Sequence, residues 1–261
     1  MIKLFATDMD GTFLRDDMTY DEKKFFELHK KMTDKNIQWV VASGNQYFQL
    51  KSFFEKYPDT IYVAENGAYI RDLNKVYAVH SFNEETTNTV ISKLQNIPDL
   101  KILVCGVKSA YVLNSESKDY IDNVKNYYHE LSILNDFNEI DDQILKFALS
   151  CPPSETEKIV ANLKLELANL AEPTSSGHGD IDIIQIGRNK AAGLAELGKE
   201  LNISLDEMCA FGDGGNDLEM LREVGLGVAM ENAQSHVKEV SDKQTTNNQN
   251  QGVLNFISEF I

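Results

Sequence analysis

The sequence predicts an α/β protein: a doubly wound, mostly parallel sheet interrupted by an inserted α+β domain. Short apolar runs alternate with helical patterns at both ends of the 261-residue chain, which is typical of a parallel sheet with helices on its faces. The alternation changes between residues 82 and 187. We therefore expect a discontinuous core domain, residues 1–81 and 188–261, and an inserted domain at residues 82–187.

The first part of the chain supplies strands and helices in alternation. Buried strands are expected at residues 2–7, 37–42 and 61–64, and helices between them at residues 21–33 and 47–56. Phe25, Leu28 and Met32 recur at helical spacing in the first helix, and the second helix ends before Pro58. A hairpin is expected at residues 67–80.

The middle segment mixes strands and helices in a different order. Helices are expected at residues 84–95 and 155–170, and strands at residues 101–105, 110–113, 145–150 and 181–186. Ile159, Leu163, Leu167 and Leu170 form an apolar stripe on the second helix. This pattern predicts helices on one face of a mostly antiparallel sheet.

After Gly187 the strand–helix alternation returns. Helices are expected at residues 190–201, 216–222 and 252–260, and strands at residues 208–211 and 226–229. The polar stretch 244–251 is short and predicts a loop. These elements return the chain to the parallel sheet of the core domain.

The composition excludes several classes of partner. The formal net charge is −16, and no run of basic residues offsets it, so the surface repels nucleic acid and anionic lipid. No apolar run reaches transmembrane length, and the N-terminus lacks the pattern of a signal peptide. We expect no nucleic-acid or membrane partner, a cytoplasmic location, and a monomer or small homo-oligomer. Cys105, Cys151 and Cys209 lack the spacing of a zinc site or a disulfide framework.

The first chemical motif is Asp8-Met9-Asp10-Gly11-Thr12, directly after the first expected strand. Ligands of open α/β sheets bind beyond the carboxyl ends of the strands. Residues i and i+2 of an extended backbone point the same way, so Asp8 and Asp10 can converge, and Gly11 lets the chain turn away. An Asp-Gly turn with acidic neighbours is the alternative explanation for this segment alone.

The second motif, Gly212-Asp213-Gly214-Gly215-Asn216-Asp217, follows the strand expected at 208–211 and leads into a helix. It therefore lies at the same sheet edge as Asp8. A glycine-rich turn in which Asn216 or Asp217 caps the helix gives the same pattern, and capping is compatible with a chemical role. Two such motifs, each after a strand, favour one shared site.

Two weaker features complete the candidate site. Ser43-Gly44 follows the second strand, and Lys190 begins a helix. A hydroxyl and an amide at a strand end can bind phosphate oxygens, and lysine is a compact cation that suits phosphate. An ordinary turn and a solvent-exposed lysine are the alternatives. The clustered carboxylates would repel each other without a divalent cation, and oxygen ligands without His or Cys favour Mg²⁺.

These segments resemble the haloacid dehalogenase (HAD) superfamily of phosphatases, and Glu65-Asn66-Gly67-Ala68 before a long insertion resembles its Cof-type branch with a class IIB cap. The resemblance implies a Rossmann-like core and an aspartyl-phosphate intermediate. It implies that Asp8 is the nucleophile and Asp10 the general acid and base. The implied Mg²⁺ ligands are Asp8, the backbone carbonyl of Asp10, and Asp213, with Asp217 supporting them. The implied phosphate-binding residues are Ser43, Gly44, Lys190, Asn216 and the amide of Met9.

The chain departs from the Cof-type pattern at two positions. Many members have Thr-Gly-Arg where this chain has Ser43-Gly44-Asn45, so the hydroxyl is kept and the guanidinium is absent. Relatives often have Gly immediately after the lysine, where this chain has Ala191. We expect the role of Lys190 to be kept.

The inserted domain is expected to cover the site, exclude water and select a small phosphate ester. Ser175, Ser176, Gly177, His178 and Asp180 form a polar segment that would face substrate hydroxyls, which favours a sugar phosphate. A simple surface loop is the alternative, and a nucleotide or phosphorylated cofactor stays open as substrate. Two other functions also stay open: a phosphomutase that shares Asp8 and Asp10, and a non-catalytic phosphometabolite-binding regulatory protein.

Overall fold

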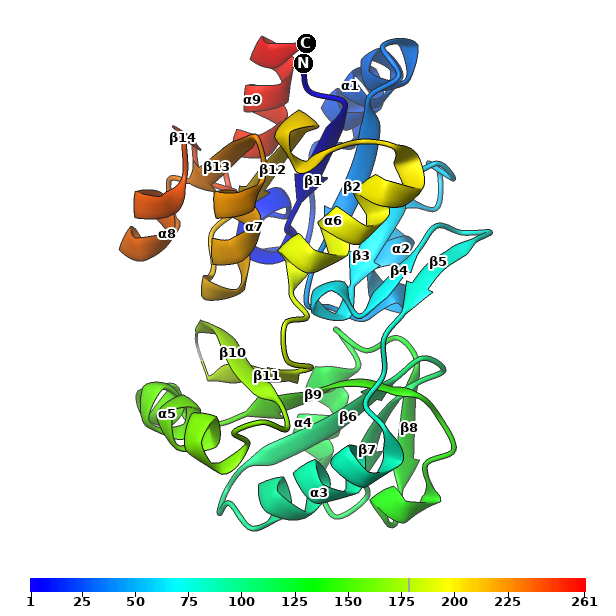
Figure 1. Ribbon diagram of the computed structural model, residues 1–261, viewed down its shortest axis with the longest axis vertical. Coiled ribbons are helices and arrows are strands. Elements are labelled where there is room, and N and C mark those ends of the chain that lie inside the picture. The colour runs from blue at the N-terminus through cyan, green and yellow to red at the C-terminus, as the bar shows by residue number, and fades with distance from the viewer. Residues whose placement is uncertain (178) are drawn as a thin grey trace.

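The structure is a computed structural model that describes residues 1–177 and 179–261. It contains two sheets, one in each half of the molecule along its long axis (Figure 1). The larger sheet, in the upper half of Figure 1, has strand order β14-β13-β12-β1-β2-β3-β4-β5. Its strands are β1 (Leu4–Thr7), β2 (Gln38–Ala42), β3 (Ile61–Ala64), β4 (Tyr69–Arg71), β5 (Val76–Val79), β12 (Met208–Gly212), β13 (Leu226–Met230) and β14 (Lys243–Thr245).

The larger sheet is doubly wound, as the sequence predicts. Strand pairs from β14 to β3 are parallel, and β3, β4 and β5 pair antiparallel. The strand order runs outward from β1 in both directions, through β2 and β3 on one side and through β12 and β13 on the other. Loops after β1 and β12 therefore lie side by side at the edge where ligands of such sheets bind.

Helices cover both faces of this sheet. They are α1 (Glu22–Asp34), α2 (Tyr47–Phe54), α6 (Lys190–Leu201), α7 (Leu218–Glu223), α8 (Ser235–Val240) and α9 (Gly252–Phe260). Phe5 and Trp39 are paired on one face, where Phe260 of α9 and Phe25 of α1 pack against them. On the opposite face, α6 approaches β3 so closely that a Cβ at Gly193 would lie 2.5 Å from the side chain of Val63. The predicted two-sided arrangement is confirmed.

The second sheet and its helices form the cap, in the lower half of Figure 1. The strand order of this sheet is β10-β11-β9-β6-β7-β8. Its strands are β6 (Lys101–Gly106), β7 (Ala110–Leu113), β8 (Leu131–Leu134), β9 (Ile144–Ser150), β10 (Glu172–Gly177) and β11 (Asp180–Ile184). Its helices are α3 (Glu84–Gln95), α4 (Lys118–Val124) and α5 (Thr156–Glu166). The pairs are antiparallel except β7 with β8.

The cap sheet has helices on both faces, which corrects the predicted one-sided arrangement. Val90 of α3 and Leu163 of α5 share a buried cluster with Phe147 of β9. Ile121 and Val124 of α4 belong to a separate buried cluster. Its strand members, such as Leu103 and Ala148, lie next in sequence to strand residues of the first cluster. Because successive residues of a strand point to opposite faces, α4 covers the face that α3 and α5 leave open.

Two linkers connect the cap to the larger sheet, one after β5 and one after β11. His80 Nε2 lies 2.8 Å from Glu196 Oε2 of α6, and Arg188 Nη1 donates to the same oxygen at 2.9 Å. Gln185 Nε2 donates to the His80 carbonyl at 2.7 Å. One carboxylate therefore holds both linkers, and on this ground we propose domain boundaries near residues 82 and 187.

The predicted elements are present, most with ends shifted by one to four residues. Among the α-helices and strands of the described residues, five were not predicted: α4, α8, β8, β10 and β14. The alternative of a simple loop is wrong for residues 175–177, which lie in β10; position 178 lies outside the described residues. The predicted loop at 244–251 is wrong for residues 244 and 245, which lie in β14. These short polar strands form by backbone pairing with β11 and β13, a contact that side-chain periodicity does not report. Within the described residues, no helix is both long and apolar enough to span a membrane.

Candidate active site

Asp8 and Asp10 stand on the loop that follows β1. Asp8 has an extended backbone, and Gly11 takes a φ of 73°, which reverses the chain immediately after Asp10. A Cβ at Gly11 would lie 2.5 Å from Asp213 Oδ2, so glycine is needed here for room as well as for conformation. Thr12 donates from its hydroxyl to Asp213 Oδ1 at 2.6 Å. The first loop therefore directly positions a carboxylate of the second.

Asp213 and Asp217 belong to the loop after β12. The backbone amides of Asp213 and Gly214 both donate to Asp217 Oδ2 at 3.0 Å, which closes the turn at the start of α7. The other Asp217 oxygen accepts a hydrogen bond from Lys190 Nζ at 2.6 Å. Asp217 is fully buried and uses both oxygens in these bonds. Both oxygens are thus engaged in hydrogen bonds, and the supporting role of Asp217 at a metal site stays a prediction.

Lys190 lies at the first residue of α6, where Asn189 caps the helix by accepting from the Ala192 amide. Its side chain is fully buried, and Nζ donates to Asp8 Oδ1 at 2.7 Å as well as to Asp217. Burial alone lowers a lysine pKa, but Asp217 and Asp8 reverse this, and the pKa of Lys190 lies above its usual value. The alternative of a solvent-exposed lysine is therefore wrong, and the side chain stays charged within the acidic cluster.

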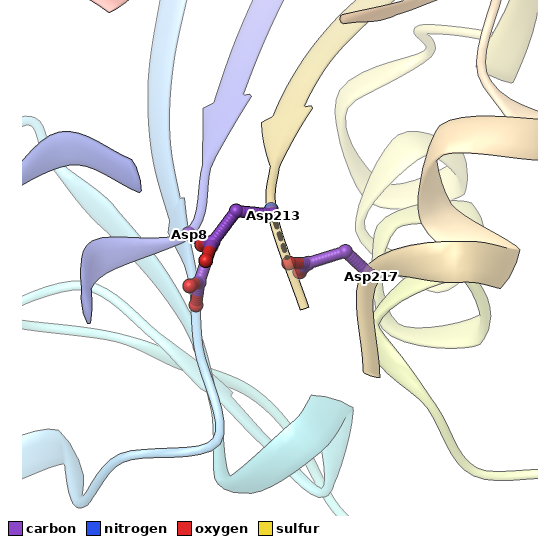
Figure 2. Close-up of side chains that lie close together, drawn as sticks. All are labelled: Asp8, Asp213 and Asp217. Atoms are coloured by element: carbon purple, nitrogen blue, oxygen red, sulfur yellow. Dashed lines mark hydrogen bonds between the residues drawn. The ribbon is translucent and has the colours of Figure 1, made fainter. Parts of the chain in front are cut away.

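Three carboxylates converge at this point. Ligand atoms of Asp8, Asp213 and Asp217 all lie within 4.8 Å of one another, and Figure 2 shows them arriving from β1, from the end of β12 and from the turn before α7. Among the hydrogen bonds of the described residues, Asp8 and Asp213 each use only Oδ1, which leaves Oδ2 of each for an ion. Carboxylate oxygens alone suit a hard cation such as Mg²⁺. The residues present therefore fit the predicted metal.

The electrostatics of the cluster call for such a cation. Burial holds the pKa of Asp8 well above its usual value, against the lowering effect of Lys190. Burial and the neighbouring Asp217 raise the pKa of Asp213 to about 6. Burial under the cap also raises the pKa of Asp10, although its side chain reaches the solvent of the cavity. A bound dication would reverse these shifts by favouring the ionised carboxylates.

The loop after β2 places Ser43, Gly44 and Asn45 beside the acids. The amide of Asn45 donates to Ser43 Oγ at 3.1 Å. The Asn45 side chain donates to Asp10 Oδ2 at 2.6 Å and to Gln49 Oε1 at 3.0 Å. Asn45 therefore holds the Asp10 carboxylate in this chain.

The site opens into a cavity of about 500 Å³ between the larger sheet and the cap. Predicted site residues on its wall are Asp8, Asp10, Ser43, Gly44, Asp213 and Asn216. The Met9 side chain is buried in the core, which leaves only its backbone for ligand contact. Of the polar cap segment, Asp180 lines the cavity, whereas Ser175 donates its hydroxyl to the Asp180 carbonyl at 2.5 Å. Tyr127 and Thr174 add further cap side chains to the wall.

Two charged residues of the cap that belong to none of the sequence motifs also line this cavity. Lys146 and Asp182 form an ion pair at 2.9 Å, and Lys146 is only 2% exposed. The signal was a lysine within the apolar strand Ile-Leu-Lys-Phe-Ala-Leu, where an unpaired charge would be costly. Such a position requires a buried acidic partner.

Comparison with known proteins now identifies the family. The chain matches haloacid dehalogenase-like hydrolases over residues 5–257. The chain belongs to this family. It is 38% identical to the 5-amino-6-(5-phospho-D-ribitylamino)uracil phosphatase YbjI of Escherichia coli strain K12, over all of this chain and 96% of that protein. It is 28% identical to the phosphatase YcsE of Bacillus subtilis strain 168, which carries the same activity in its name, over all of this chain and 96% of that protein.

Solved structures agree with this assignment. SMU.1108c from Streptococcus mutans UA159 matches with a TM-score of 0.94 and 32% identity, over all of this chain and 99% of the other. The HAD subclass IIB sugar phosphatase BT4131 matches with a TM-score of 0.83 at 19% identity, over 99% of this chain and 98% of the other, which shows the shared fold of core and cap. This haloacid dehalogenase-like hydrolase is thus a phosphatase of phosphoric monoesters, and the predicted family and reaction class are confirmed.

Proposed function

We propose that this phosphatase is Mg²⁺-dependent and hydrolyses a small phosphate ester through an aspartyl-phosphate on Asp8. The observation that carries the proposal is the meeting of Asp8, Asp213 and Asp217 within 4.8 Å, from loops more than 200 positions apart. Asp8, the Asp10 carbonyl and Asp213 would hold the ion, with Asp217 and Lys190 behind them. The ion would supply electrostatic stabilisation of the phosphoryl oxygens.

The chemistry divides into two balanced steps. An Asp8 carboxylate oxygen attacks phosphorus, the bond from phosphorus to the ester oxygen breaks, and Asp10 gives its proton to that leaving oxygen. A water then attacks the phosphorus while Asp10 takes its proton, and the bond to Asp8 breaks to release inorganic phosphate. Burial raises the pKa of Asp10, the direction that a general acid needs, and Asn45 keeps its carboxyl in place.

The remaining predicted residues orient the phosphoryl group. Ser43, Gly44 and Asn216 lie on the cavity wall beside Asp8, where their polar groups can meet phosphoryl oxygens. Lys190 neutralises charge from beneath Asp8, and the Met9 amide lies next to the attacking carboxylate. The cap encloses the cavity and limits water access during the first step.

For the substrate we propose a phosphorylated polyol or sugar, and within that class the 5-amino-6-(5-phospho-D-ribitylamino)uracil named for the relatives in Escherichia coli and Bacillus subtilis. The cavity of about 500 Å³ has the size of sites for molecules of this kind. Asn123, Thr174 and Asp180 offer hydrogen-bonding groups to a hydroxylated chain, and Tyr127 offers an aromatic surface to a ring.

The test is phosphate release from this compound, sugar phosphates, nucleotides and phosphorylated cofactors, ranked by kcat/KM. We expect the ribitylamino compound or a sugar phosphate to rank first, EDTA to stop release and Mg²⁺ to restore it. Isomerisation without phosphate release would instead indicate the mutase, and full activity in EDTA would remove the metal from the mechanism.

The assigned nucleophile has its own prediction. Asp8→Asn should lower kcat by about a thousandfold or more, because the amide cannot form the phosphorylated intermediate. Circular dichroism should match that of the unaltered protein. Asp122→Asn, which alters an exposed ion pair with Lys125 on the cap, is the matched control and should keep full activity. Near-normal turnover in Asp8→Asn would overturn the nucleophile.

A further inference from the structure

We propose that Lys146 and Asp182 of the cap are positioning residues for the phosphate-binding loops of the larger sheet. The inference rests on the proposed function and extends it to two residues outside the motifs. Both residues line the active-site cavity from the cap, on β9 and β11. Their side chains are the central links of a chain of polar contacts that reaches both walls of the phosphate site.

The first half of the chain runs from Lys146 to the loop after β2. Lys146 Nζ donates to the Gly44 carbonyl at 2.6 Å, across the boundary between cap and core. Hydrogen bonds from a charged donor are the stronger kind, and this one is buried. The carbonyl of a predicted phosphate-binding residue is therefore fixed by a cation that the cap carries.

The second half runs from Asp182 to the loops after β3 and β12. Asp182 Oδ1 accepts from Lys146 at 2.9 Å, and Asp182 Oδ2 accepts from Asn66 Nδ2 at 2.6 Å. Asn66 Oδ1 in turn accepts from Asn216 Nδ2 at 3.3 Å. The far end of the chain is thus a second predicted phosphate-binding side chain, so the cap pair joins Gly44 on one side to Asn216 on the other.

The core backbone is shaped for these contacts. Glu65, Asn66 and Gly67 have consecutive positive φ angles of 52°, 55° and 91°, an arrangement that is costly for the first of them. It turns Asn66 toward Asp182. At Gly44, a Cβ would lie 3.0 Å from Asp182 Oδ2 and 3.2 Å from the Asn66 amide. Both loops are therefore fitted to the cap carboxylate.

Charge also favours a defined geometry. Lys146 lies 3.5 Å from Glu65 Oε2 in addition to Asp182, and both Lys146 and Glu65 are 2% exposed. Burial raises the pKa of Glu65 to about 7, with Lys146 acting in the opposite direction. Lys146 would keep Asp182 of the same cap sheet if the cap opened, but Glu65 of the core would lose its cation and Gly44 its charged donor. The closed arrangement is therefore the one in which Gly44, Asn66 and Asn216 are held together.

The test uses the full chain, with inorganic phosphate as the probe in the presence of Mg²⁺. Lys146→Met and Asp182→Asn should each raise the Kd for phosphate, measured by calorimetry, by about tenfold. Amide hydrogen exchange should also rise in the peptides that carry Gly44 and Asn66. Asp182→Asn keeps the size of the side chain, so it stays informative if Lys146→Met does not fold.

Two control variants separate positioning from general stability. Lys101→Met removes a partly exposed ion pair of the neighbouring cap strand, and Gln46→Ala removes two hydrogen bonds between core and cap at Glu130. Both should keep the phosphate affinity of the unaltered protein.

The outcomes are distinct. Folded Lys146 or Asp182 variants with a lower Tm but a phosphate Kd within about threefold of the unaltered protein would overturn the inference and leave the phosphatase proposal standing. Equal losses in Gln46→Ala would also overturn it, because any cap contact would then suffice. An unaltered protein that neither binds nor releases phosphate would overturn the proposed function and the inference together.

Discussion

Replacing Lys190 by methionine tests the charge balance of the acidic cluster. The substitution keeps the length of the side chain and removes an ammonium that contacts Asp8 at 2.7 Å and Asp217 at 2.6 Å, with no exposed surface on the lysine. Charges about 4 Å apart interact by about 4 kcal/mol at an effective dielectric constant of about 20, and burial of each ion costs several kcal/mol. Removing one partner of a buried pair therefore lowers the free energy of unfolding by about 3–5 kcal/mol.

The assay is thermal unfolding in EDTA at pH 8, where a loss of this size lowers the Tm by roughly 6–20 °C. Mg²⁺ should raise the Tm of Lys190→Met more than that of the unaltered protein, because the ion then meets carboxylates that no ammonium offsets. Lowering the pH toward 5.5 should narrow the difference, since the unpaired carboxylates take up protons.

The matched control for this substitution is Lys56→Met. Lys56 pairs with Glu22 at 3.1 Å with both side chains largely exposed, so its loss should change stability by less than about 0.5 kcal/mol. Two results would contradict this reasoning: a Tm of Lys190→Met in EDTA equal to that of Lys56→Met, or a rise in its Tm on adding Mg²⁺ no larger than that of the unaltered protein. Either result would mean that the buried ammonium does not offset the charge of the carboxylates.

Three further predictions follow from the same geometry. In EDTA the stability of the unaltered protein should fall as the pH rises from about 4 to about 6, because the folded state binds a proton on Asp213 more tightly than the unfolded chain does; urea unfolding with saturating Mg²⁺ should remove this slope. Gly11→Ala should weaken Mg²⁺ binding by about tenfold in calorimetry, since its Cβ would displace Asp213, and unchanged affinity would contradict the close approach. Glu196→Ala should cost about 1 kcal/mol and raise hydrogen exchange in both linkers around His80 and Arg188; exchange confined to one linker would refute their shared anchor.

The core elements were predictable because their side chains carry the signal. Apolar strands such as Leu4–Thr7 and Ile61–Ala64 are buried along their whole length, and α1 presents Phe25, Leu28 and Met32 on one face. Periodicity reports such burial directly. Helix α4 was missed because only Ile121 and Val124 of its seven residues are buried, too few to define a period. Strands β10 and β14 were missed because backbone pairing, rather than apolar alternation, places them.

The candidate site divides in the same way. Asp8, Asp213 and Asp217 lie on loops that immediately follow strands of the same sheet, so their meeting could be inferred from the adjacent positions of these strands. Lys146 and Asp182 are separated by 36 positions within the cap, and their partners Gly44 and Asn66 belong to the core. No local pattern specifies that pairing, because it depends on how the cap packs against the larger sheet.

The charges of the site imply an order of binding. Asp8, Asp213 and Asp217 outnumber the single ammonium of Lys190, and Lys146 is already paired with Asp182. A phosphate dianion that entered before a cation would meet an excess of negative charge in a largely enclosed cavity, where repulsion is only weakly screened. A dication that enters first removes the repulsion among the carboxylates and offers the phosphoryl oxygens an opposite charge. The excess of negative charge therefore predicts that the proposed dication binds before the phosphate ester.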